Sequence, residues 1–197
     1  MYSPDHNSWH APSECVWADG RIPIPDRTAI SLSYPSMESF FKSILNVQSP
    51  DLSMHVRALV ELSRRPSEEA TRIKDAIMLI SSLNPTHADL ESLSACNIFH
   101  VRLANGTRQW TNKSADFAIN DRAQYAHAFR DKIAMLDFTL EEVREADLFL
   151  EALGLHPKYL SRSVRESTNV THGSPHEPLT VDLRSRAFAI CRYVTAC

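Results

Sequence analysis

Two groups of side chains in the sequence have the residue types of transition-metal ligands. In one group, His172 and His176 are four residues apart and Glu177 follows directly. On a helix, this spacing would place two imidazoles on the same metal ion. A glycine and two prolines interrupt the segment around these residues, so no helix can fix that geometry. The sequence therefore predicts solvated loop histidines and no metal at this position.

The second group lies near the N-terminus, where His6 and His10 precede Cys15. These residues belong to a segment with closely spaced prolines, which is expected to be an extended arm and not a preformed metal site. We expect no metal here either. An arm stabilised by a transition metal stays open as a weaker alternative.

Carboxylates gather between positions 141 and 151, and paired carboxylates perform general acid–base catalysis when they line a cleft. The run comprises Glu141, Glu142, Glu145, Asp147 and Glu151. We expect these side chains to lie opposite the apolar stripe of an amphipathic helix, where solvated charges are typical. The run therefore predicts a solvated face.

A small basic group could serve an acidic partner, with Arg64 and Arg65 followed by Arg72 and Lys74. A solvated helix end is the simpler expectation. No serine or cysteine lies in a turn that would mark an activated nucleophile. The catalytic residues of any enzyme in this chain are therefore unknown from the sequence.

Glycine is scarce, with four residues at positions 20, 106, 154 and 173. Loops that bind phosphates need closely spaced glycines, because only glycine brings the backbone close to the ligand without a Cβ clash. The chain accordingly has no P-loop and no dinucleotide-binding turn. We expect no cofactor.

Composition sets further limits on function. The 197 residues are 43% hydrophobic and carry a net charge of −3, which argues for a globular fold and against a nucleic-acid partner. No apolar run is long enough to span a membrane. The N-terminus does not resemble a secretory signal, so we expect a cytoplasmic or nuclear protein.

The expected fold class is α+β and predominantly helical, with a helical N-terminal half. Residues 1–35 are predicted to be an extended arm with Trp9 and Trp17, which pack on their own domain or on a partner. Residues 36–96 are predicted to be helical because apolar residues recur at helical spacing. Three of the expected helices pass through Met37, Phe40, Phe41, Ile44 and Leu45; through Leu52, Val56, Leu59 and Val60 with Pro50 in the first turn; and from Ser67 through Ile73, Ile77, Ile80 and Leu83. Asn84-Pro85 ends the third, and a shorter fourth helix is expected to carry Leu90 and Leu93.

Residues 97–138 change to a strand period. Alternating segments flank Asn105-Gly106, which predicts a hairpin with a type I′ turn. Phe99 and Val101 are expected on the buried face, whereas His100 and Arg102 are expected to face solvent. A short helix near 121–130 and a buried strand in K-I-A-M-L-D-F follow.

Residues 139–197 are predicted to be helical, and residues 36–197 are expected to form one domain. Thr139 and Glu142 form a capping-box pattern, and Gly154 supplies the stop of that helix. A last amphipathic helix over 180–197 has no stop signal. This suggests a chain truncated at its C-terminus, with the apolar face of that helix as a contact surface for a protein partner.

A family resemblance begins at residue 97. The strings C-N-I-F-H-V-R-L-A-N-G-T, S-A-D-F-A-I-N-D-R, K-I-A-M-L-D-F-T-L-E-E-V-R-E and L-F-L-E-A-L-G-L-H-P-K-Y-L-S-R-S-V-R-E resemble a stretch of large uncharacterised fungal proteins. Those proteins carry an N-terminal GHKL ATPase of the sacsin or NO VEIN kind. The resemblance implies a region downstream of the ATPase, and this chain has no match to the nucleotide-binding motifs.

Two functions follow as hypotheses. The preferred one is a non-enzymatic interaction or scaffold domain, as a piece of a longer fungal protein. The alternative is a small accessory protein or enzyme of a fungal biosynthetic pathway. Such an enzyme would use dispersed groups near the hairpin, namely His100, His127, Asp116 and Asp121.

Overall fold

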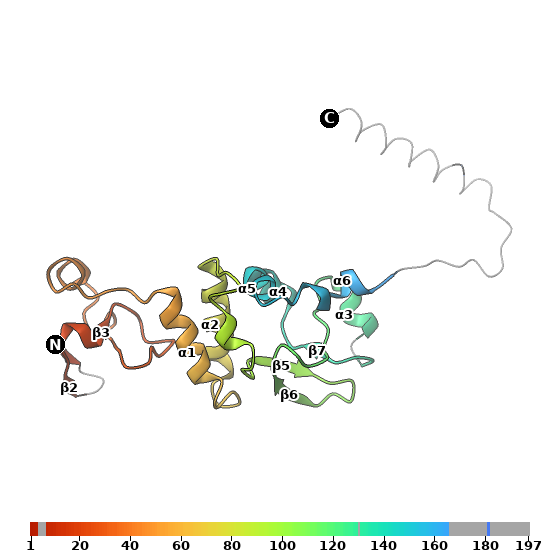
Figure 1. Cartoon of the computed structure of the whole chain (residues 1–197), viewed down its shortest axis with the longest axis horizontal. Coiled ribbons are helices and arrows are strands. Elements are labelled where there is room, and N and C mark those ends of the chain that lie inside the picture. The colour runs from red at the N-terminus through yellow and green to blue at the C-terminus, as the bar shows by residue number, and fades with distance from the viewer. Residues whose placement is uncertain (4–6, 130, 166–180, 182–197) are drawn as a thin grey trace. The chain divides into compact units, whose positions relative to one another are not determined.

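The computed structural model describes residues 1–3, 7–129, 131–165 and 181 (Figure 1). The chain divides into two units, Met1–Val164 and Arg165–Cys197. Helices and small β-sheets both occur in the first unit, so the expected mixture of α and β structure is confirmed. The expected helix over 180–197, and with it the proposed contact surface, lies outside the described residues except for residue 181.

Helix α1 (Leu52–Leu62) begins where Asp51 caps it, because the Asp51 carboxylate accepts a hydrogen bond from the Met54 amide at 2.8 Å. Pro50 therefore precedes the cap instead of occupying the first turn. Val56 and Leu59 are buried as the apolar stripe predicts.

Helix α2 (Ala70–Ser82) buries one apolar face in the main core. Its apolar face consists of Ile73, Ala76, Ile77 and Ile80, all fully buried. The helix begins at Ala70 and not after a Ser67 cap, which corrects its predicted start. Leu83 caps the C-terminal end and is exposed, so it does not belong to the buried face. Asn84 adopts a left-handed conformation (φ +54°) directly before Pro85, as expected for a helix end.

The first predicted helix differs from expectation. Residues Phe40–Ile44 form a π-helical segment, η2, in which the Leu45 amide donates to the Phe40 carbonyl at 3.2 Å. Only Phe41 of the predicted stripe is buried, whereas Met37, Phe40 and Ile44 are exposed. Phe41 packs in a small second core with Cys15, Ile30 and Val47.

The N-terminal residues are part of the first unit and not a separate arm. They form the short strands β1 (Tyr2–Ser3), β2 (Ser8–Trp9), β3 (Cys15–Val16) and β4 (Thr28–Ala29), with the 3₁₀ turn η1 (Pro12–Glu14) between them. Val16, Ile22 and Ile24 belong to the main hydrophobic core together with α1 and α2. This packing places residues 1–35 on their own domain, so the division of the chain differs from the predicted boundary at residue 35.

The predicted hairpin is present. Strands β5 (Phe99–Arg102) and β6 (Arg108–Thr111) pair antiparallel, and β7 (Met135–Leu136) joins the other edge of β5. The turn is not type I′, because Gly106 (φ +82°) has a positive φ and Asn105 does not. The Gly106 amide donates to the Leu103 carbonyl at 2.9 Å, as in a three-residue loop closed by a glycine bulge.

The capping box of Thr139 and Glu142 is confirmed, and it starts α4 (Leu140–Glu145). The single helix that we expected here is divided at Ala146, and α5 (Asp147–Ala152) follows. Gly154 (φ +75°) ends α5 as predicted, and the Leu155 amide donates to the Leu150 carbonyl at 2.9 Å.

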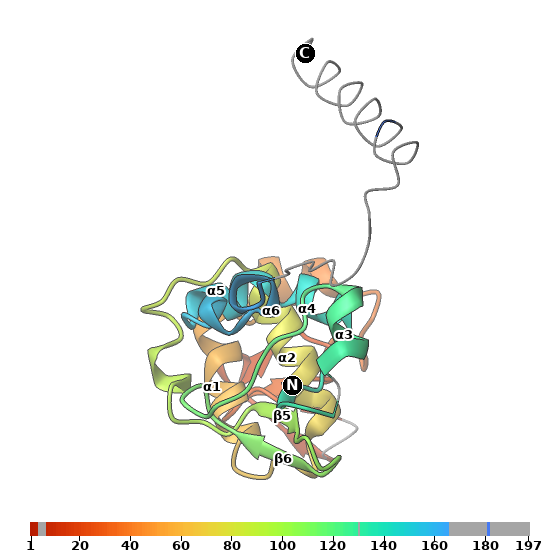
Figure 2. The ribbon, with the colours of Figure 1, turned by 90° about the vertical axis from the view of Figure 1, so that its right-hand side faces the viewer.

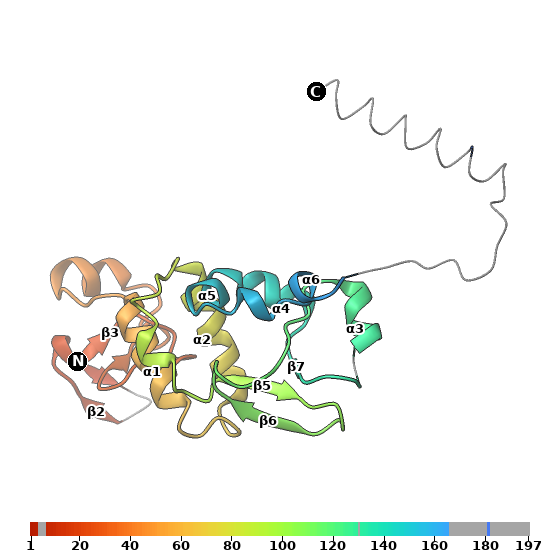
Figure 3. The same cartoon turned by 45° about the vertical axis from the view of Figure 1, so that its right-hand side comes forward.

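The remaining elements complete the unit. They are η3 (Glu91–Leu93), α3 (Ala123–Phe129), η4 (His156–Lys158) and α6 (Leu160–Ser163). Figure 2 and Figure 3 show α4 and α5 on one side of α2 and the β5–β6 hairpin on another. Side chains from all of these layers contribute to one main core. Among the described residues, no helix is long and apolar enough to cross a membrane.

One buried hydroxyl joins α2 to the start of α5. The residue before α5 is Ala146, which has no side-chain acceptor, and the Phe149 amide donates instead to Ser81 Oγ at 3.3 Å. Ser81 is buried. A serine of α2 thus satisfies an amide in the first turn of α5.

Ser81→Ala should lower the free energy of unfolding by about 1–3 kcal/mol, because it leaves the buried Phe149 amide without an acceptor. Urea denaturation measures the change. Ser82→Ala is the matched control, since the neighbouring Ser82 is exposed and should change stability by less than about 0.5 kcal/mol. Equal losses in the two variants would contradict this role of Ser81.

Candidate functional site

Two adjoining pockets lie along α2 and share one wall. The first has a volume of about 550 Å³ and lies between the N-terminal segment, α1 and α2. The second has a volume of about 390 Å³ and lies between α2, α4 and the hairpin. Asp75, Met78 and Glu145 line both pockets. We call the first the N-terminal pocket, the second the hairpin pocket, and the two together the α2 groove.

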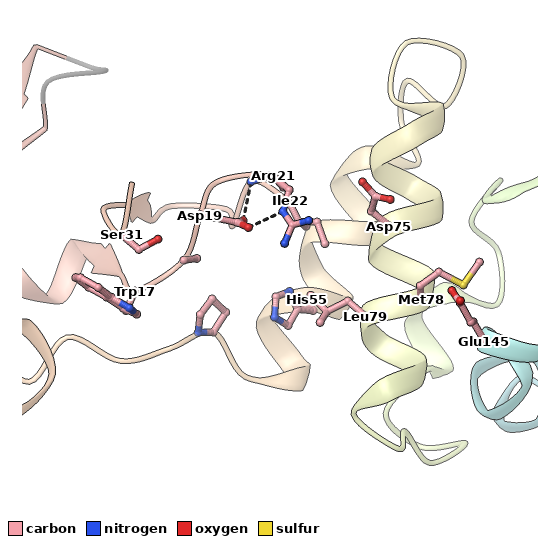
Figure 4. A pocket seen from close by; sticks show the side chains of 12 residues that line it. Trp17, Asp19, Arg21, Ile22, Ser31, His55, Asp75, Met78, Leu79 and Glu145 are labelled. Carbon is pink, nitrogen blue, oxygen red and sulfur yellow. Dashed lines mark hydrogen bonds and ion pairs between the residues drawn. The ribbon is translucent and has the colours of Figure 1, made fainter. Parts of the chain in front are cut away.

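The N-terminal pocket combines apolar walls with a buried imidazole. Figure 4 shows His55 of α1 between the N-terminal residues Trp17, Asp19 and Arg21 and the α2 residues Met78 and Leu79. Helical spacing from Leu52, Leu59 and Leu62 places His55 on the buried face of α1. The side chain is 7% exposed.

The His55 ring has an unsatisfied nitrogen. Nδ1 is buried and has no hydrogen-bond partner. Burial lowers the pKa of His55 below 6.5 and outweighs the nearby Asp51 carboxylate, which raises it. The ring is therefore neutral at pH 7. A buried N–H without an acceptor is rarer than a buried acceptor without a donor, which favours the tautomer with its proton on Nε2.

Carboxylates outnumber cations around the N-terminal pocket. Asp19, Asp75 and Glu145 line it together with one guanidinium, that of Arg21. Arg21 Nε lies 2.5 Å from Asp19 Oδ2, so Arg21 neutralises Asp19. Asp75 and Glu145 are exposed and form no ion pair within the described part of the chain. The shared wall therefore carries two uncompensated negative charges.

The charges that line only the hairpin pocket are paired with each other. Lys74 Nζ lies 2.9 Å from Glu142 Oε1 and 5.0 Å from the centre of the Phe138 ring. His100 stacks on Trp110 with ring centres 4.8 Å apart, and His100 Nδ1 lies 3.1 Å from Asp137 Oδ2. These contacts hold Trp110 and His100 against the pocket. They also leave His100 half-buried, which corrects the expectation that it faces solvent.

The four residues of the alternative enzyme site do not come together. His100 lines the hairpin pocket, whereas Asp116 lines a different pocket beside α6. His127 is exposed on α3. The Asp121 carboxylate accepts a hydrogen bond at 3.0 Å from the amide of Ser161, a residue of α6. The sequence hypothesis had grouped these residues only by type and proximity in the chain.

The charged runs behave partly as predicted. Glu141, Glu145 and Glu151 are exposed, but Glu142 binds Lys74 and Asp147 accepts a hydrogen bond from the Tyr159 hydroxyl at 2.8 Å.

The predicted basic group is neutralised by neighbouring carboxylates. Arg64 pairs with Glu61, Arg65 with Glu68, Arg72 with Glu69 and Lys74 with Glu142. No uncompensated basic patch therefore forms from these four residues.

The N-terminal metal candidates separate into different environments. His10 Nε2 lies 2.7 Å from Ser8 Oγ, and Cys15 is buried in β3. Burial raises the pKa of the Cys15 thiol, and a protonated thiol is a poor metal ligand. His6, His172, His176 and Glu177 lie outside the described residues. Within the described ranges, no group of three His, Cys, Asp or Glu side chains is placed to hold a metal ion.

Sequence reasoning missed the principal residues of the groove. His55 shares the apolar face of α1, and its position at helical spacing between leucines was the available signal. Asp75 and Met78 belong to a second stripe of α2 that no motif marks. Trp110 was assigned only to a strand, although its indole faces His100. Glu145 was noted only as one of five acidic residues.

The free energy of unfolding should rise with pH below about pH 6.5 because of His55. Its pKa is lower in the folded state than in the unfolded chain, so the unfolded chain binds more protons in this range. The slope contributed by one such proton is at most about 1.4 kcal/mol per pH unit, and it vanishes below the folded pKa. Urea denaturation between about pH 5 and pH 7 measures it.

His55→Phe should remove that part of the slope, because it removes the titrating ring. His127→Gln is the control, since His127 is exposed and should leave the slope as it is. The same slope in the wild type and in His55→Phe would show that His55 does not cause the pH dependence.

The comparisons with known proteins place most of this site within one family. The family described as a domain of unknown function (DUF8348) matches residues 53–164, which is more than half of the chain. No curated protein and no solved structure matches the chain. The matched region contains every residue that lines the hairpin pocket, whereas the N-terminal pocket also uses residues 17–31 and 50.

Proposed function

The chain belongs to this DUF8348 family, and we propose that it is a non-enzymatic interaction domain. The observation that carries this proposal is the α2 groove, whose two pockets adjoin across a shared wall. The combined space exceeds the volume of a single side chain and extends along α2. It suits a ligand with several groups in sequence, such as a peptide segment.

The lining of the groove supports this function. Trp17 lines one pocket and Trp110 lines the other, and Met78 contributes to both. Tryptophan and methionine are enriched at protein–protein interfaces, because they supply large apolar contact areas. Ion pairs among the lining residues, such as Lys74 with Glu142, hold these side chains in place before a partner arrives. A preorganised wall lowers the entropic cost of binding.

Three further expectations belong to this proposal. We infer that the apolar face predicted for 180–197 is a second contact surface, in addition to the α2 groove. We also infer a relationship to the large fungal proteins with a GHKL ATPase, and a cytoplasmic or nuclear location. Each of these rests on the sequence.

Peptides that bind the full chain should occupy the α2 groove. A display library of random nine-residue peptides, selected on the full chain, supplies the ligands, and fluorescence anisotropy measures their affinity. Met78→Trp fills the shared wall, and Thr71→Trp places an indole at an exposed position beside the hairpin pocket. Each variant should weaken the selected peptides about tenfold or more.

Leu148→Trp is the control, because Leu148 is exposed and does not line either pocket of the groove. It should leave the affinities unchanged. Thermal melts check that Met78→Trp remains folded. Selection of no peptide, or equal affinity for the control and both groove variants, would refute the α2 groove as an interaction surface.

A further inference from the structure

We propose that the occupant of the α2 groove is a peptide segment that carries a lysine or arginine side chain and presents a backbone carbonyl to His55. This inference rests on the proposed function, since it names the partner of the same groove. Two independent observations carry it. One is the charge of the shared wall, and the other is the buried imidazole of the N-terminal pocket.

The shared wall attracts a cation. Asp75 and Glu145 line both pockets and are exposed, and neither forms an ion pair within the described residues. The other two carboxylates of the groove differ, because Arg21 neutralises Asp19 and Lys74 neutralises Glu142. A ligand that crosses the shared wall meets two negative charges without counterions from the protein. A basic side chain supplies the missing charge.

His55 indicates a second, neutral group on the ligand. The side chain is more than nine-tenths buried, and its Nδ1 has no partner. With Nδ1 enclosed in the protein, Nε2 is the polar atom that this ring can offer to the N-terminal pocket. The favoured tautomer makes Nε2 a donor. An anionic acceptor would be repelled by Asp75 and Glu145, so a neutral carbonyl is the acceptor that fits.

A peptide carries a neutral hydrogen-bond acceptor and a positive charge close together. Every residue of a peptide carries a backbone carbonyl, and a lysine or arginine adds the positive charge on a long apolar stem. Met78 and Leu79 provide apolar contact for that stem, and Trp17 offers an aromatic face. A small polycation would satisfy the carboxylates but would leave the His55 donor without an acceptor.

Three fluorescein-labelled pools of nine-residue peptides test this assignment against the full chain. Each pool has random neutral residues around a fixed central residue, which is lysine, acetyl-lysine or glutamate. Fluorescence anisotropy should give the highest affinity for the lysine pool. Acetylation should weaken binding about fivefold or more, because it removes the charge and keeps the length of the side chain.

The variants separate the charge from the hydrogen bond. Asp75→Asn combined with Glu145→Gln should remove the preference for lysine over acetyl-lysine. Glu91→Gln combined with Glu141→Gln is the matched control, because both residues are exposed, lie outside the groove and change the net charge equally. His55→Phe should weaken all pools that bind, and His55→Gln, which keeps an N–H donor, should restore part of the affinity.

The outcomes distinguish this inference from the proposed function. Binding of the acetyl-lysine or glutamate pool as tightly as the lysine pool, still weakened by Met78→Trp, would overturn the basic ligand and retain the interaction surface. Displacement of the lysine pool by spermidine at equal concentration would overturn the peptide in favour of a small polycation. No binding of any pool, together with no selected peptide from the random library, would overturn both proposals.

Discussion

Burial of one face of α2 is the constraint on which the rest of the first unit depends. Ile73, Ala76, Ile77 and Ile80 are fully enclosed, and α1, α5 and the first residues of β5 contribute to the same core. Packing of this kind is the dominant favourable contribution to folding, because it removes apolar surface from water. The N-terminal segment joins the same core through Val16, Ile22 and Ile24.

The same burial determines where the groove lies. Thr71, Lys74, Asp75 and Met78 follow one another at spacings of three, one and three residues, which defines a second stripe on α2. This stripe is offset by two residues from the buried one, and two residues correspond to about 200° around a helix. When the apolar face of α2 packs into the core, the stripe that lines the groove therefore lies on the opposite side of the helix. Side chains that line a site from a rigid helix keep their geometry better than side chains on a loop.

The sequence predicted local structure well wherever short-range chemistry decides it. The capping box of Thr139 and Glu142, the stop at Gly154 and the hairpin around Gly106 each depend on residues within a few positions of one another. Long-range packing decided the other cases. Residues 1–35 contain too many prolines for a continuous helix, but Ile22 and Ile24 still enter the main core. Met37 and Ile44 have helical spacing, yet no element covers them among the described residues.

The groove could not be predicted because its parts come from distant segments. Trp17, His55, Asp75 and Glu145 are separated by twenty or more residues along the chain, and none belongs to a known motif. Only His55 carried a local signal, since a histidine on an apolar helical face must be buried neutral or paired. His55 is neutral in the folded protein, because burial lowers the pKa of its imidazole more than the Asp51 carboxylate raises it. In the proposed site, a neutral donor therefore lies beside two exposed carboxylates. The ligand must bring a hydrogen-bond acceptor to His55 and a positive charge to the shared wall. The acceptor and the positive charge must also be spaced to fit within the length of α2. A site with these two conditions selects its ligands more narrowly than an acidic surface alone.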